Sequence, residues 1–192
     1  VGAYQDDDGG SASGSAYTFV RSGTSWSQQA KLVAGDAAAN DLFGISVSIS
    51  GDYAVVGAFQ DDDGGSASGS AYTFVRSGTS WSQQAKLVAD DAAAYDYFGT
   101  SVSVSDDYAL VGAYGNDDGG TNPGSAYTFV RSGTSWSQQA KLVASDAAVY
   151  HYFGYSVSIS GDYALVGAYL DDDGATQSGS AYTFVRSGTS WS

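Results

Sequence analysis

The 192-residue sequence contains no cysteine and no methionine, which excludes disulfides and thiolate metal sites. It also contains no glutamate, and lysine and arginine together number only seven, so the net charge is −14. Such a surface repels phosphate backbones and anionic lipids, so we expect no nucleic-acid partner. No apolar run approaches the ~20 residues of a membrane span, so we expect no membrane insertion either.

What is present is enough for a folded domain. Hydrophobic residues make up 43% of the chain and aromatic residues 14%, which supplies the apolar surface of a core. All 21 acidic residues are aspartate, whose short side chain favours turns. The sequence begins at Val1, without a methionine and within a repeat, so we expect a processed product or part of a longer protein.

A repeat of 55 residues runs through the whole sequence without an insertion. The tryptophans show it most simply, at Trp26, Trp81, Trp136 and Trp191. One segment, GSAYTFVRSGTSWSQQAKLVA, is identical at 14–34, 69–89 and 124–144. A fixed period of this length predicts an array of equal structural units.

Each period contains four β-strand signals rich in β-branched and aromatic residues. In one repeat they lie at 46–50, 53–58, 70–75 and 80–89. The only helix-like stretch, at 91–98, is too short to form more than a turn. Four strands per repeat of this length predict an all-β fold, a β-propeller in which every repeat is one four-stranded blade.

Three segments also carry a recognisable motif. FGISVSISGDYAVVGAF at 43–59 and its copies at 98–114 and 153–169 resemble FG-GAP repeats, the blade motif of the integrin α-subunit propeller and of many bacterial secreted proteins. The resemblance implies a propeller from an extracellular or cell-surface protein. The integrin-type calcium loop is cut here to SGDY, so the resemblance does not carry over that metal site.

The length corresponds to about 3.5 repeats in a single propeller segment, 1–192. We expect full blades at about 46–89 and 101–144, with partial blades at 1–34 and 156–192. A three-blade ring would be smaller than the four to eight blades that propellers use. Because open blades expose strand edges, we expect homo-oligomerisation through the split blade to complete the ring, or a longer array.

Antiparallel order places the two short turns of a blade on one face and its two long connectors on the other. Only four aspartates fall in the short turns, which leaves 17 of the 21 on the long-loop face. The repeats differ from one another almost wholly in these long connectors. We therefore expect the long-loop face to be an acidic rim that carries the function.

The aspartate triplets of this rim are candidate ligands for Ca²⁺, a hard cation that binds several oxygens. A solvated acidic turn is the alternative, because the spacing is not that of a known calcium loop. The candidate ligands are Asp6, Asp8, Asp61, Asp63, Asp117, Asp118, Asp171 and Asp173.

Aromatic residues in the connector between blades are candidates for contacting a glycan or a protein. The alternative is that their rings fold inward and pack the blade edge. The set is Tyr95, Tyr97, Tyr150, His151 and Tyr152. The single histidine has no serine and aspartate at a spacing that suggests a triad, so we expect no enzyme.

Three functions remain open from the sequence. The first is a non-catalytic extracellular or cell-surface module that presents the acidic rim for binding or adhesion, with Ca²⁺ as a candidate cofactor. The second is a glycan-binding propeller that uses the aromatic loops. The third is a self-assembling or designed scaffold, which near-identical repeats favour.

Overall fold

A computed structural model describes residues 1–118 and 120–192, and within them it contains strands, turns and loops but no helix. No segment of this described part could therefore cross a membrane as a long apolar helix. The strands are β1 (Gly2–Ala3), β2 (Ser15–Ser22), β3 (Ser25–Leu32), β4 (Ser46–Ser50), β5 (Tyr53–Ala58), β6 (Ser70–Ser77), β7 (Ser80–Leu87), β8 (Ser101–Ser105), β9 (Tyr108–Ala113), β10 (Ser125–Ser132), β11 (Ser135–Leu142), β12 (Phe153–Ser160), β13 (Tyr163–Ala168), β14 (Ser180–Ser187) and β15 (Ser190–Trp191).

The strands form four antiparallel meanders in which spatial order follows chain order. They are β1-β2-β3, β4-β5-β6-β7, β8-β9-β10-β11 and β12-β13-β14-β15. Three of the sheets are thus four-stranded blades, as the sequence predicts, and the first sheet has three strands. Two short additions were not expected: Gly2–Ala3 adds to the first sheet and Ser190–Trp191 to the last.

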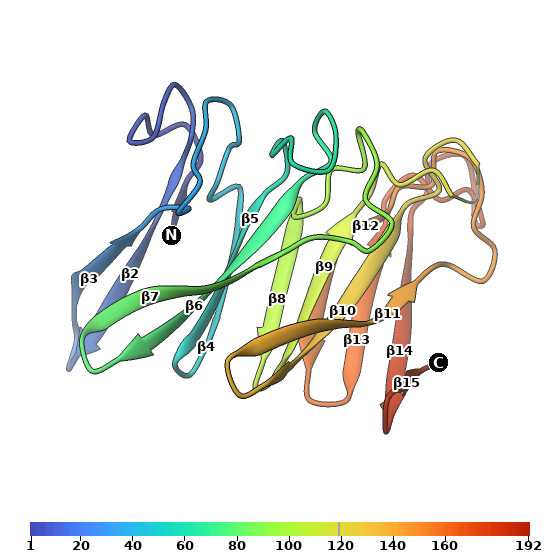
Figure 1. Ribbon diagram of the computed structural model, residues 1–192. Coiled ribbons are helices and arrows are strands. Elements are labelled where there is room, and N and C mark those ends of the chain that lie inside the picture. The colour runs from blue at the N-terminus through green and yellow to red at the C-terminus, as the bar shows by residue number, and fades with distance from the viewer. Residues whose placement is uncertain (119) are drawn as a thin grey trace.

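The four sheets stand side by side in an open row, with the two chain ends at opposite ends of it (Figure 1). The first strands β4, β8 and β12 contact one another more closely than the outer strands β3, β7, β11 and β15 do. Sheets that converge at one edge and spread at the other are arranged like the blades of a propeller.

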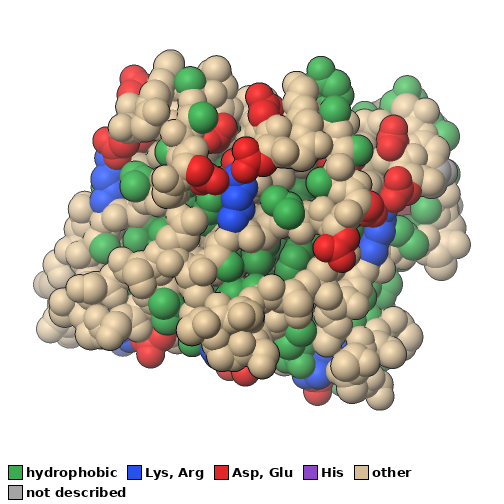
Figure 2. Space-filling view, viewed as in Figure 1, with side chains coloured by type: hydrophobic (Ala, Val, Ile, Leu, Met, Phe, Trp, Pro, Cys, Tyr) green, Lys and Arg blue, Asp and Glu red, His purple; other side chains and the backbone are tan. Residues whose placement is uncertain are grey.

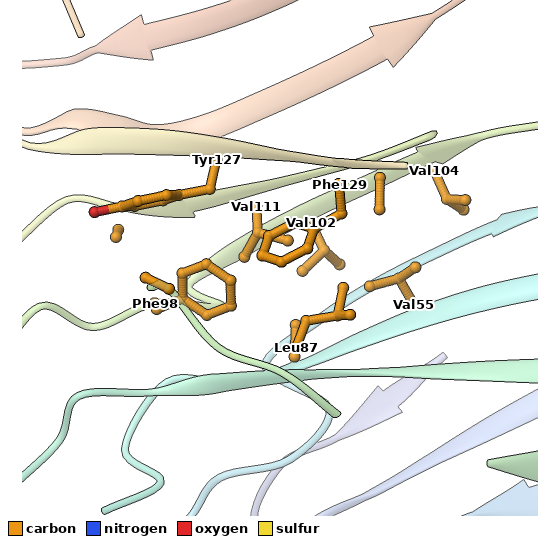
Figure 3. Packing of buried hydrophobic residues seen from close by; sticks show 12 residues of the cluster. Val55, Leu87, Phe98, Val102, Val104, Val111, Tyr127 and Phe129 are labelled. Carbon is orange, nitrogen blue, oxygen red and sulfur yellow. The ribbon is translucent and has the colours of Figure 1, made fainter. Parts of the chain in front are cut away.

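A separate apolar cluster fills each of the three junctions between blades. In the middle junction Phe98 is fully buried and meets Tyr127 and Phe129 edge to face, with ring centroids 5.6 and 5.9 Å apart. Val55 and Leu87 approach these rings from the preceding blade (Figure 3). The phenylalanine of the FG pair is therefore the central side chain of the interface.

The glycines of the motif are explained by a close approach between consecutive repeats. A Cβ atom on Gly57 would lie 1.9 Å from the carbonyl oxygen of Gly99, and Gly112 faces Gly154 in the same way. No side chain fits at such a distance. The two halves of the motif thus touch across the junction, because glycine alone lets the backbones come that close.

All short hairpins lie at one edge of the row and all long connectors at the other, as predicted (Figure 1). At the hairpin edge Arg131 pairs with Asp107 of its own blade and lies 4.1 Å from the ring centre of Tyr53 in the preceding one. These short turns therefore hold local ion pairs, while the long connectors carry the remaining aspartates.

Candidate functional site

The first aspartate of a triplet faces into the protein. The side chain of Asp61 is only 5% exposed, at the start of the connector between β5 and β6. The hydroxyl of Tyr72 donates a hydrogen bond to its Oδ2 at 2.8 Å, and Nζ of Lys86 lies 2.9 Å from the same oxygen. Asp61 is thus an interior carboxylate with two donors.

Lys86 joins three aspartates from two connectors. Its ammonium also contacts Asp63 of the same triplet and lies 2.9 Å from Asp36, in the loop that enters the blade. Burial alone lowers the pKa of Lys86, but hydrogen bonds to the three carboxylates outweigh burial and raise it. The lysine therefore stays charged and ties the two long loops of the junction together.

The same arrangement recurs along the row with one substitution. Lys141 contacts Asp91 and Asp118, while buried Asn116 stands where the other repeats have the first aspartate of the triplet. At the N-terminal end Lys31 contacts Asp6 and Asp8. Figure 2 shows red acidic groups around each blue lysine just below the long loops.

Oxygen atoms of Asp36, Asp61 and Asp63 lie within 4.8 Å of one another, a spacing that suits a cation. The Lys86 ammonium already contacts all three, so a Ca²⁺ ion would have to displace it. The donor set therefore does not fit a bound metal while the lysine stays in place. Calcium at the triplets remains a prediction.

The middle aspartates shape the loops. Oδ1 of Asp62 accepts a hydrogen bond from the backbone nitrogen of Ala67 at 2.7 Å, and the copies at Asp7 and Asp172 do the same in their turns. Asp117 occupies this middle position in the third repeat, so it is not equivalent to the first aspartates with which the sequence analysis grouped it. The neighbouring Gly119 lies outside the described residues.

Two buried carboxylates were not predicted from the sequence. Asp41 and Asp96 lie in the connectors between blades. The carboxylate of Asp41 accepts a hydrogen bond from the backbone nitrogen of Ala38, and that of Asp96 accepts one from the backbone nitrogen of Ala93. Burial raises the pKa of both carboxyls. The signal available in the sequence was their 55-residue spacing within otherwise varied loops.

His151 occupies the position equivalent to Asp41 and Asp96, and it is buried. Its Nδ1 lies 3.3 Å from Oδ2 of Asp171, which is fully buried. The hydroxyl of Tyr182 donates to that same oxygen at 2.6 Å, and Asp173 follows at the exposed end of the triplet. The structure therefore places His151 inside the junction rather than on the rim.

The predicted tyrosines divide into two kinds. Tyr97 and Tyr152 pack inward, stacked on Tyr114 and Tyr169 with ring centroids 5.1 and 5.7 Å apart. A contact of 5.7 Å between Tyr114 and Tyr152 links the two pairs into one ladder across the blades. Burial raises the pKa of Tyr114 to about 12.

Tyr95 and Tyr150 lie on the solvent side of this ladder, in successive repeats. Tyr95 is 57% exposed and Tyr150 is 52% exposed. Both have left-handed backbone, at φ 69° and 64°, a conformation that is uncommon for a bulky residue. Each ring leans on the tyrosine two residues further on, at 6.3 and 6.1 Å. These two rings are the exposed aromatic groups of the predicted set.

A shallow groove of about 290 Å³ opens beside Tyr95. Its polar wall comes from the connector between β3 and β4 and from the connector between β5 and β6. The lining residues are Ala39, Asn40, Gln60, Asp62, Ser66, Ala67, Tyr95 and Tyr97. The groove thus combines an aromatic face with amide, hydroxyl and carboxylate groups.

Comparison with known proteins agrees with the geometry of the blades. The FG-GAP repeat family matches three successive stretches, 26–74, 81–129 and 136–184, each running from the outer strand of one blade to the third strand of the next. No curated protein matches the chain. Because the matched stretches cover most of its length, the chain belongs to the FG-GAP repeat family.

Proposed function

We propose that this chain is a non-catalytic binding or adhesion module of a secreted or cell-surface protein, and that it binds through its long-loop face. The observation that carries the proposal is the pair of exposed rings, Tyr95 and Tyr150, held on a packed tyrosine ladder. Exposed aromatics on a rigid support contribute strongly to binding because little side-chain entropy is lost on contact.

The titratable groups of this face support a binding role over a catalytic one. His151 is buried against Asp171, and Asp61 is engaged by Lys86 and Tyr72. A general acid or base must reach a substrate, and these groups are directed at one another. Their contacts hold neighbouring loops together, which is what a rigid binding face needs.

Charge supports neutral or cationic ligands. With a net charge of −14 and most aspartates on the long-loop side, anionic partners are repelled from this face. The lysines here are already surrounded by carboxylates. Neutral glycans and basic protein surfaces are the partners that such a rim accepts.

The test compares tyrosines on opposite faces. The Tyr95→Ala/Tyr150→Ala double variant and the Tyr163→Ala control, whose ring is exposed at the hairpin edge, are measured beside the wild type. Glycans and basic extracellular-matrix proteins are immobilised as probes. We expect the double variant to lose at least tenfold in affinity and the control to keep it. Equal binding by all three, or no binding by any, would contradict the proposal.

A second candidate function, self-assembly, is favoured by the two ends of the row. Phe19 in the first blade is 41% exposed, while its copy Phe74 is 3% exposed. In the second blade, beside the three-stranded first sheet, Ile49 is 58% exposed against 6% for its copy Val104. Beside them an apolar groove of about 480 Å³ lies between β2, β3 and β4. Leu165 is likewise exposed in the last blade.

We propose that the isolated chain covers these faces with a second copy, end blade against end blade. The interior junctions bury many equivalent residues, such as Phe74 and Phe129, so the outer faces of the first and last blades carry residues of the kind that pair inside the row. Light scattering at micromolar concentration should give a homo-oligomer. Phe19→Asp should shift the mass toward monomer, because Phe19 is exposed on the first blade. A folded wild-type monomer would rule this assembly out.

Calcium dependence is a further part of the proposal, at the aspartates named from the sequence. What supports it is the close grouping of three carboxylates around Lys86. What opposes it is the ammonium itself, which neutralises them. Calcium binding therefore requires exchange of one cation for the other, and it is tested below by removing the lysine.

A further inference from the structure

The groove beside Tyr95 is held open by backbone contacts. The nitrogen of Tyr95 donates to the carbonyl of Ser66 at 2.8 Å, and that of Asn40 donates to Ser11 at 2.8 Å. On the remaining side the nitrogen of Gln60 donates to Asp41 at 3.4 Å. Four connectors are thus tied together, three of which line the groove, so the groove is formed before any ligand arrives.

Its polar groups offer both donors and acceptors. Asn40 and Gln60 each carry an amide, and Ser66 carries a hydroxyl. Asp62 uses Oδ1 to bind the nitrogen of Ala67, which leaves Oδ2 available to accept. Among the described lining residues there is no lysine or arginine, so the groove offers an anion no cationic side chain.

We propose that this groove binds a neutral pyranose unit of a glycan. Tyr95 would cover one apolar C–H face of the ring, while Asn40, Gln60, Ser66 and Asp62 would exchange hydrogen bonds with its hydroxyls. A hydroxyl is both donor and acceptor, which matches this mixed lining. The inference rests on the proposed function, since it names the ligand class of the long-loop face.

The repeats limit the site to one junction. At the next junction the positions of Asn40 and Gln60 are taken by Tyr95 and Gly115, which removes both amides. The aromatic wall is retained there, as Tyr150. The tyrosine rim therefore continues along the row, but the polar set of the groove does not.

The experiment uses methyl glycosides of neutral hexoses and N-acetylhexosamines, with an array of their oligosaccharides. Affinity is measured by calorimetry and ligand-observed NMR for the wild type, Tyr95→Ala and Gln60→Ala. The matched control is Gln5→Ala, which removes the equivalent glutamine from the first repeat, outside the groove. We expect one sugar per chain, at least a tenfold loss for Tyr95→Ala, a threefold or greater loss for Gln60→Ala, and no change for the control.

Two outcomes would overturn the sugar site separately from the proposed function. If no neutral glycan binds while a basic protein binds through Tyr95 and Tyr150, the groove proposal fails and the binding face stands. If glycans bind but Tyr150→Ala loses as much affinity as Tyr95→Ala and Gln60→Ala loses none, the ligand lies along the rim and the groove proposal also fails. If neither neutral glycans nor basic proteins bind the long-loop face of the wild type, the groove proposal and the proposed function both fail.

Discussion

The ammonium of Lys86 lies 2.9 Å from the buried carboxylate of Asp61, and the two residues are 25 positions apart in the chain. The lysine comes from the outer strand β7 and the aspartate from the connector between β5 and β6. Because Asp36 joins them from the loop that enters the blade, one lysine fastens both long loops of a junction. The acidic rim is therefore built on internal ion pairs.

Removing this lysine should destabilise the protein. Lys86→Met leaves Asp61 buried without its cation, and we expect the free energy of unfolding to fall by about 2 to 3 kcal/mol. Urea unfolding measures it. Lys31→Met is the matched control: its partners Asp6 and Asp8 are more exposed, so its decrease should be smaller. Equal effects of the two variants would argue against the importance of burial.

The same variant tests calcium. In Lys86→Met the three carboxylates are free to take Ca²⁺, so the melting temperature should rise with millimolar Ca²⁺. A Ca²⁺ concentration ten times the dissociation constant raises the free energy of unfolding by about 1.4 kcal/mol. The wild type should respond less, because its ammonium competes. A wild type that gains as much as the variant would show that the ion binds elsewhere.

Asp96 should give a defined pH dependence. Burial raises its pKa in the folded protein above the ordinary value of 3.8, so between those two values the folded state holds more protons than the unfolded state. This contribution to stability is present below 3.8 and is lost as pH rises through the raised pKa. Asp96→Asn should therefore be more stable than wild type at pH 7, with the difference shrinking toward pH 4.

The measurement for Asp96 is urea unfolding at several pH values. Asn can still accept the hydrogen bond from the backbone of Ala93, so the loop geometry is kept. Asp62→Asn serves as the comparison, since Asp62 is exposed. A difference between Asp96→Asn and wild type that does not vary with pH would contradict the assignment to this carboxyl.

The glycine contact between repeats makes a steric prediction. Gly112→Ala would place a Cβ atom 1.9 Å from the carbonyl oxygen of Gly154, so we expect a loss of about 3 kcal/mol from forced separation of the blades. Gly78→Ala has open space but positive φ, and should lose only about 1 kcal/mol. Thermal melting ranks the two. The reverse order would disprove the close approach.

Much of the fold follows from the period of 55. Because the strand signals repeat at the fixed spacing marked by positions such as Trp81 and Phe98, four strands per repeat and the separation of hairpins from long loops could be predicted from the sequence. The resemblance to FG-GAP repeats independently implies the same blade architecture. Sequence reasoning also placed the aspartates on one face correctly, since parity of antiparallel strands decides it.

The candidate site could be predicted only in part. Tyr95 and Tyr97 are two residues apart in one loop, yet one ring is exposed and the other packs into the ladder. His151 looked like a rim residue and is buried against Asp171. These differences arise from contacts with the neighbouring blade, about which local sequence carries no information.

The sequence by itself determined the strands, the blades and the side on which charge collects, because each depends on spacing and alternation along the chain. Only the tertiary structure decided which aspartates meet a lysine and which tyrosines face solvent. The physical reason is that each junction joins side chains from successive repeats, such as Asp36 and Lys86, which lie 50 positions apart and meet only when two blades pack together.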